Sequence, residues 1–139
     1  WHAGAVGSRM RDSATAVLTA CGIEAKSTSL LGQLAVAEED WVAAVAYFYY
    51  SGDQDRGTGI MEEKSVTSKD LAFRARLAAA NESWLVASRF SAAAGQTRRP
   101  HEFRAKHFDS KEMYGEAAAE WTLAGFNRKA DASRARTLA

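Results

Sequence analysis

Stretches rich in alanine and larger apolar residues alternate along the chain with short polar segments. One such segment, Glu38-Glu39-Asp40, separates a stretch that ends near Ala37 from another that begins at Trp41. Asn81-Glu82-Ser83 divides a second pair of stretches in the same way. Alanine is the commonest residue and Pro100 is the only proline, a bias that favours helix because alanine loses the least free energy on entering one. The pattern predicts about seven helices and no strand.

An internal repeat joins these stretches into pairs. Residues 34–44 align without a gap with residues 77–87, 43 positions further on, and a second step of the same length leads from Ala87 to Ala130. Each copy is predicted to be a helical hairpin, because a short polar turn between two helices folds them back on each other. The predicted units are residues 28–52, 68–95 and 109–138, with residues 1–22 as part of a preceding unit and polar connectors at 53–67 and 95–108.

Small residues within these units follow a spacing that resembles the tetratricopeptide repeat, W-x2-L-G-x2-Y-x8-A-x3-F-x2-A. The first unit reads Leu31-Gly32-x2-Ala35-x8-Ala44-x3-Phe48-x2-Ser51, the second Ala75-x2-Ala78-x8-Ala87-x3-Ser91-x2-Ala94, and the third Ala117-Ala118-x2-Trp121-x8-Ala130. The sequence departs from the family in two respects. Its period of 43 residues is longer than the usual repeat of about 34 residues, and no proline closes a unit.

The resemblance implies an all-α fold, in which antiparallel helical hairpins stack as a short right-handed α-solenoid over a single domain, residues 1–139. It also implies a concave groove lined by the first helix of each unit, with Gln33 and Arg76 at equivalent positions that bind a partner. The third equivalent position is Ala119, which has no polar group, so Glu116, one turn earlier on the same face, is the third candidate. A different helical-hairpin repeat and a closed helical bundle are the alternatives.

Composition narrows the class of protein. The length of 139 residues suits one domain, and the formal net charge of +1 produces no strong field for nucleic acid or anionic lipid. Cys21 is the only cysteine, so no internal disulfide forms, and an intracellular or organelle interior is favoured over secretion. The longest uncharged run, Trp41–Gly52, is shorter than the roughly 20 residues that a membrane-spanning helix needs. Trp1 at the first position indicates a processed product or a fragment of a longer chain.

The usual motifs for a metal, a cofactor or a nucleophile are not matched. His101 and His107 lie six residues apart, about 240° around a helix, whereas a zinc-binding H-E-x-x-H motif needs two histidines on one face. The acidic, glycine-containing segment at 53–59 resembles a calcium loop, but Thr58 stands where that loop needs glycine. We therefore expect no metal site, no cofactor and no enzymatic activity.

One segment concentrates positive charge and aromatic rings. Its candidate anion-binding or nucleic-acid-binding residues are Arg98, Arg99, Arg104, Lys106 and Lys111, with Phe103 and Phe108 between them. Such clusters bind phosphates and stack bases. The alternative is a solvated loop that its two phenylalanines anchor to the core.

The aromatic run Tyr47-Phe48-Tyr49-Tyr50 cannot be buried completely if it is helical, because four consecutive side chains point in all directions. Tyrosine is enriched at protein interfaces, so Tyr47, Tyr49 and Tyr50 are candidate partner-binding residues. A neighbouring connector that covers these rings is the alternative.

These features predict a non-catalytic protein–protein interaction or scaffold module, a subunit of a larger assembly with protein partners. A small helical RNA-binding or nuclease-like domain that uses the basic loop at 98–111 is the alternative. A structural subunit of a membrane-bound complex is a third hypothesis.

Overall fold

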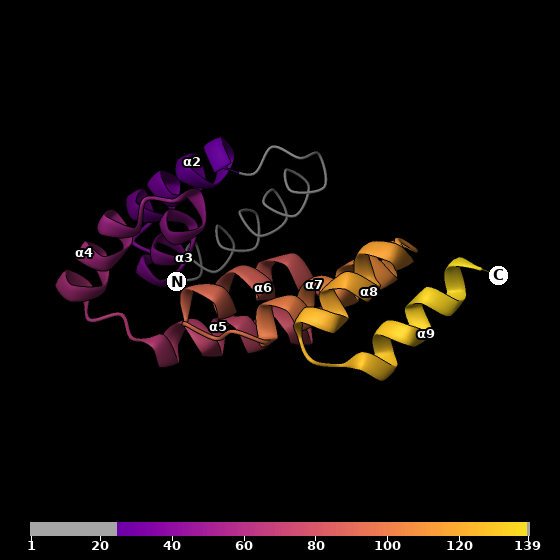
Figure 1. Cartoon of the computed structure of the whole chain (residues 1–139). Coiled ribbons are helices and arrows are strands. Elements are labelled where there is room, and N and C mark those ends of the chain that lie inside the picture. Colours follow the sequence, from indigo (N-terminus) through magenta and orange to yellow (C-terminus); the bar gives the residue numbers. More distant parts are fainter. Residues whose placement is uncertain (1–24, 139) are drawn as a thin grey trace.

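The computed structural model describes residues 25–138, and all the regular structure in that range is helical (Figure 1). Its helices are α2 (Ala25–Ala37), α3 (Trp41–Ser51), α4 (Gln54–Lys64), α5 (Ser68–Ala80), α6 (Trp84–Ala93), α7 (Arg99–Ser110), α8 (Tyr114–Leu123) and α9 (Asn127–Thr137). The expected partial unit at 1–22, with Cys21, lies outside the described residues.

Helices that follow each other in the chain pack together, from α2 to α4 and again from α5 to α9. The two groups meet through α3, which packs on α6 and α5. In Figure 1, α2 and α4 lie at one end of the array and α9 at the other, with α5 and α6 between them. The prediction of an all-α fold built from packed helical hairpins is confirmed.

The buried apolar side chains form two clusters in series. The larger one draws on α2, α3, α5 and α6, is centred on Phe48 and Phe90, and includes Phe103 of α7. The smaller one holds α7, α8 and α9 together around Trp121, with alanines at the helix crossings. Small side chains at these crossings let the helix backbones approach closely.

A turn motif recurs three times and corrects the predicted repeat. In each copy a glutamate with positive φ ends one turn, an aromatic residue begins the next helix, a buried alanine follows three positions later, and a glycine with positive φ ends that helix. The copies are Glu39, Trp41, Ala44 and Gly52; Glu82, Trp84, Ala87 and Gly95; and Glu112, Tyr114, Ala117 and Gly125. The second step is therefore 30 residues instead of 43, and Ala117 replaces Ala130 as the counterpart of Ala44 and Ala87.

Identical backbone bonding explains why the motif repeats. In each copy the glutamate two residues before the aromatic has positive φ. This left-handed conformation lets the amide of the following residue donate a hydrogen bond to a carbonyl near the end of the preceding helix, as in a Schellman motif. These bonds are Asp40 N to Ala35 O (2.9 Å), Ser83 N to Ala78 O (2.9 Å) and Met113 N to Phe108 O (2.8 Å). The geometry is local, and the turns at Glu39 and Glu82 were predicted from the sequence, whereas the third turn, at Glu112, was not.

The prediction of a polar connector at 53–67 is wrong, because most of this segment is α4. Asp53 caps the helix by accepting a hydrogen bond from Arg56 N (3.3 Å), and Ser65, with φ of 55°, ends it. Gly57 is buried where a Cβ would lie 3.2 Å from the ring of Tyr49. Gly57, one of the glycines that suggested a loop, instead allows α4 to approach α3 closely.

The prediction of a connector at 95–108 is also wrong. Pro100 lies in the first turn of α7, where a missing amide hydrogen breaks no intrahelical bond. The basic segment at 98–111 is therefore a helix and not a loop. Consequently α8 packs on both α7 and α9, and the predicted unit at 109–138 covers only α8 and α9 as complete helices.

Candidate functional site

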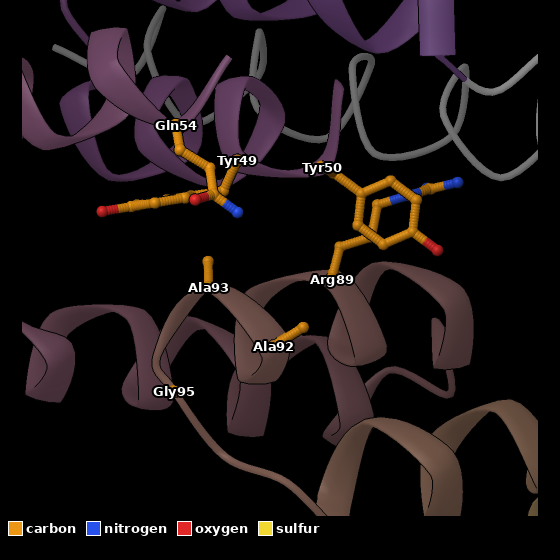
Figure 2. Close-up of a pocket in the computed structure, with 7 residues that line it drawn as sticks. All are labelled: Tyr49, Tyr50, Gln54, Arg89, Ala92, Ala93 and Gly95. Carbon is orange, nitrogen blue, oxygen red and sulfur yellow. The ribbon is translucent and has the colours of Figure 1, made fainter. Parts of the chain in front are cut away.

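A cleft of about 380 Å³ lies between α3, the start of α4 and the end of α6 (Figure 2). It is lined by Tyr49, Tyr50, Gln54, Arg89, Ala92, Ala93 and Gly95. Its volume lies within the range of small-ligand sites, about 300–1,000 Å³. We call it the inter-hairpin cleft, because α3 and α6 are the second helices of two successive hairpins.

Aromatic rings form one wall of the cleft and small side chains form the other. Tyr49 and Tyr50 come from the last turn of α3, and the two alanines come from the last turn of α6, across the gap (Figure 2). The Tyr49 hydroxyl is hydrogen-bonded to Thr58 Oγ1 (2.8 Å) and lies 3.5 Å from Met61 Sδ, which fixes the ring against α4. The small residues Ala92 and Ala93 leave the space that larger side chains would fill.

The opposite end of the cleft is basic. Arg89 is only 2% exposed, and its guanidinium carbon lies 4.7 Å from the centre of the Tyr50 ring. Arg104 Nη1 of α7 donates to the Tyr50 hydroxyl (3.2 Å), and Arg104 Nε donates to Glu120 Oε1 (3.1 Å). Glu120 Oε2 also lies 2.7 Å from His101 Nδ1. The tyrosine ring thus lies between two arginines, which fixes its position.

His107 of α7 lies near some of the same basic residues, and its pKa is lowered. Burial lowers the pKa of His107 from 6.5, and Lys111, Arg104 and Arg89 lower it further through repulsion of the protonated ring. The same field that disfavours an additional cation favours an anion. The cleft therefore combines an apolar, aromatic slot with the side chain of one arginine, Arg89, an arrangement suited to a carboxylate attached to an apolar group.

The predicted basic residues do not form one patch. Arg104 faces Tyr50, and Lys111 is close enough to His107 to lower its pKa. Lys106 points elsewhere, with Nζ 4.9 Å from the centre of the Trp84 ring and 3.8 Å from Glu102 Oε1. Arg98 lies near Gly125 in the turn before α9, and Arg99 is exposed at the start of α7. Because the segment is helical, its charges are distributed around the helix.

The three tyrosines predicted to bind a partner do not all lie at one site either. Tyr49 and Tyr50 line the cleft, so the structure brings them together with Arg104, which the sequence placed in a different group. Tyr47 is only 2% exposed and packs in the larger core cluster. This corrects the expectation that Tyr47 contacts a partner.

The three predicted groove residues are exposed but belong to helices that do not form one surface. Gln33 lies on α2, Arg76 on α5 and Glu116 on α8, and these helices pack mainly on α3, on α6, and on α7 with α9, respectively. Gln33 and Arg76 each lie eight residues before the aromatic that begins the next helix. The residue at the same position before Tyr114 is Lys106. Ala119, the predicted third equivalent, and Glu116, which replaced it as a candidate, therefore do not correspond to Gln33 and Arg76.

Sequence reasoning missed Arg89, Gln54 and the alanine wall of the cleft. Arg89 is the only charged residue of a helix rich in alanine and larger apolar residues, and this position was the signal that could have identified it, because a buried charge normally has a specific environment. Gln54 had no such signal, since its role depends on the existence of α4.

Among residues 25–138, no three metal-ligating side chains gather at one point. None of the helices in that range is long and apolar enough to span a membrane. Comparisons with protein-family models, curated proteins and solved structures find no match to the chain. The interpretation of the site therefore depends on its own geometry.

Proposed function

We propose that the chain is a non-catalytic protein-interaction module, and that the inter-hairpin cleft binds a partner segment carrying a carboxylate next to an apolar or aromatic side chain. The observation that carries this proposal is the pairing, within one cleft, of the Tyr49 and Tyr50 rings with the basic end at Arg89. An apolar side chain inserted against the rings and Ala92 gains hydrophobic burial, and the carboxylate gains charge attraction in a partly desolvated site.

The cleft also fits a scaffold role because it is formed between two hairpins. Tyr49, Tyr50 and Gln54 come from the first group of helices, whereas Arg89 and Ala92 come from α6. A ligand that touches both sides stabilises their relative position, since any ligand that binds only the folded arrangement shifts the equilibrium toward it. This would couple binding to the rigidity of the array.

Selection from a random 12-residue peptide library tests the proposal. We expect enriched peptides to share an acidic residue beside an aromatic or aliphatic one, and to bind with dissociation constants of about 1–100 μM. Ala92→Trp fills the cleft and should weaken binding at least about tenfold, a loss of roughly 1.4 kcal/mol. Gln54→Glu adds a negative charge beside the ligand and should also weaken binding.

Ala119→Trp is the matched control, because Ala119 is also an exposed alanine on a second helix of a hairpin but lies on α8, outside the cleft. It should leave peptide affinity unchanged. Failure to enrich any peptide, or enriched peptides that bind the Ala92→Trp and Ala119→Trp variants equally well, would contradict the proposal.

A further inference from the structure

The contact between α6 and α7 shows how one helix of this chain binds the aromatic residue that begins a neighbouring helix. The ring of Trp84, the first residue of α6, stacks on Phe103 of α7 with centroids 6.2 Å apart and an interplanar angle of 20°. Lys106 Nζ of α7 lies 4.9 Å from the centre of the same ring. One turn along α6, Ser88 Oγ donates to Pro100 O (2.9 Å). Two residues of α7 thus form a receptor for the aromatic that starts α6.

The same receptor residues recur on α5, where they are exposed. Phe103 and Lys106 lie eleven and eight residues before the aromatic Tyr114; Phe73 and Arg76 lie eleven and eight residues before the aromatic Trp84. Phe73 is 53% exposed, and the guanidinium carbon of Arg76 lies 5.9 Å from the centre of its ring. Leu77, one turn further on, is 46% exposed. In α7, by contrast, Phe103 is 5% exposed beneath Trp84.

The helix α4 explains why this receptor on α5 is open. In the first group of helices, Lys64 at the end of α4 has its Nζ 4.5 Å from the centre of the Trp41 ring, the interaction that Lys106 makes with Trp84. The aromatic of α3 is therefore already covered by α4. As a result, the preceding hairpin does not occupy the receptor on α5, the helix that follows α4. In Figure 1, α5 lies along one side of the array, between its two ends.

The position on α2 that is equivalent to this receptor is less specific. Leu30, Gln33 and Leu34 occupy it, with Leu30 61% and Leu34 52% exposed, but it has no aromatic ring and no cation. Of these two helices, α2 and α5, only α5 combines an exposed ring, a cation beside it and an apolar residue one turn away. An arginine next to an aromatic ring favours a second aromatic through stacking and cation–π attraction.

We propose that Phe73, Arg76 and Leu77 of α5 form a docking surface for a helix of a partner protein, one that begins with tryptophan or tyrosine and has a small residue four positions later. The occupant is deduced from the chain's own α6, whose Trp84 and Ser88 fill the equivalent surface of α7. This surface lies outside the inter-hairpin cleft, and the proposal does not depend on the function proposed for the cleft.

The probe is an acetylated and amidated 14-residue peptide that copies residues 82–95, with Leu85→Gln, Val86→Gln and Phe90→Gln so that only the α7-facing side is retained. Its binding to the full chain is measured by isothermal titration calorimetry. We expect saturable binding below about 1 mM, weakened at least about fivefold by Phe73→Ala combined with Arg76→Ala. Arg76→Lys alone should retain affinity, because lysine performs this role at Lys106.

Two controls separate docking from unspecific adhesion. A peptide that also carries Trp84→Ala should not bind, and the Leu30→Ala, Leu34→Ala protein should bind as well as the unmodified chain. All replaced protein residues are exposed, so circular dichroism should show unchanged helix content in every variant. No binding at about 1 mM, equal binding of the two peptides, or insensitivity to the Phe73 and Arg76 changes would overturn the proposal.

Self-association is measured on the same samples by sedimentation velocity. We expect a sedimentation coefficient that does not depend on protein concentration. A dimer that Phe73→Lys disperses would assign the surface to a second copy of this chain and would overturn the assignment to a partner helix.

Discussion

Arg74 of α5 and Asp40 at the start of α3 form a two-point ion pair, with Arg74 Nη1 3.1 Å from Asp40 Oδ1 and Nη2 3.4 Å from Oδ2. Asp40 also caps α3, since its Oδ1 accepts a hydrogen bond from Ala43 N (3.3 Å). The Arg74 guanidinium carbon lies 4.9 Å from the centre of the Phe90 ring of α6. A single carboxylate thus connects the start of α3 to the second hairpin.

Removal of this carboxylate should loosen the contact between the two groups of helices. We expect Asp40→Ala to lower the free energy of unfolding by about 2 kcal/mol, because it removes a helix cap and leaves a partly buried arginine without this partner. Asp40→Asn keeps a capping oxygen and should lose about half as much. Urea denaturation followed by circular dichroism measures both, and equal stability of all three proteins would refute the coupling.

Two glycines should respond in opposite directions to alanine. A Cβ on Gly32 would lie 2.8 Å from Phe48 Cε1, whereas a Cβ on Gly59 would have no neighbour within 4 Å. Gly32→Ala should therefore destabilise the protein by about 1–3 kcal/mol through overpacking of the core. Gly59→Ala, within the exposed α4, should stabilise it by about 0.5–1 kcal/mol through reduced backbone entropy of the unfolded chain.

The measurement for this pair is the urea midpoint of each variant against the unmodified protein. If Gly59→Ala also lowered the midpoint, α4 would not be the regular helix described above. A neutral effect of Gly32→Ala would show that α2 moves away from Phe48 without loss of stability.

Asp109 joins the last three helices. Its Oδ2 accepts from Trp121 Nε1 of α8 (2.8 Å), and its Oδ1 accepts from Ser133 Oγ of α9 (2.9 Å). We expect Asp109→Ala to cost about 2–4 kcal/mol, because it leaves two buried donors without an acceptor. Amide hydrogen exchange should show lost protection in α8 and α9 before α3, whereas uniform loss of protection would indicate one cooperative unit instead.

The free energy of unfolding should decrease as the pH falls below neutrality, because of the lowered pKa of His107. Its pKa in the folded protein lies below the value of 6.5 that applies to the unfolded chain, mainly because of burial and then because of Lys111, Arg104 and Arg89. Between these two values the unfolded state binds more protons than the folded state, so the free energy of unfolding rises with pH there and levels off above 6.5.

The control is His107→Gln, which removes the titrating group. We expect the urea midpoint of the unmodified protein to drop more than that of the variant between pH 7.5 and pH 5.5, a window chosen from the ordinary histidine pKa of about 6.5. Parallel pH dependence of the two proteins would show that His107 is not the responsible group.

Much of the helix content could be read from the sequence because its signals are local. The turns at Glu39 and Glu82 were located correctly, and so were the two helices that start at Trp41 and Trp84. Local signals were misread where glycine and proline suggested loops. Gly57 and Pro100 instead serve a close helix contact and a first helical turn, and only the neighbouring helices distinguish these roles.

The candidate site was predictable only in part. The sequence predicts Tyr49 and Tyr50 as partner-binding residues and Arg104 as an anion-binding residue, but it does not predict that they lie together, because the contact between Tyr50 and Arg104 spans 54 residues. The burial of Tyr47 and the dispersal of the basic segment depend on which face of each helix meets a neighbour.

The sequence by itself determined an all-helical chain, its hairpin turns at Glu39 and Glu82 and the small residues at its helix crossings, because capping bonds and helix propensity act within a few residues. The tertiary structure alone decided that Lys64 of α4 lies over Trp41, that α7 forms a hairpin with α8, and that α5 is left with an open face. These outcomes depend on competition between helices for the same apolar surface, which is settled by packing between residues far apart in the chain.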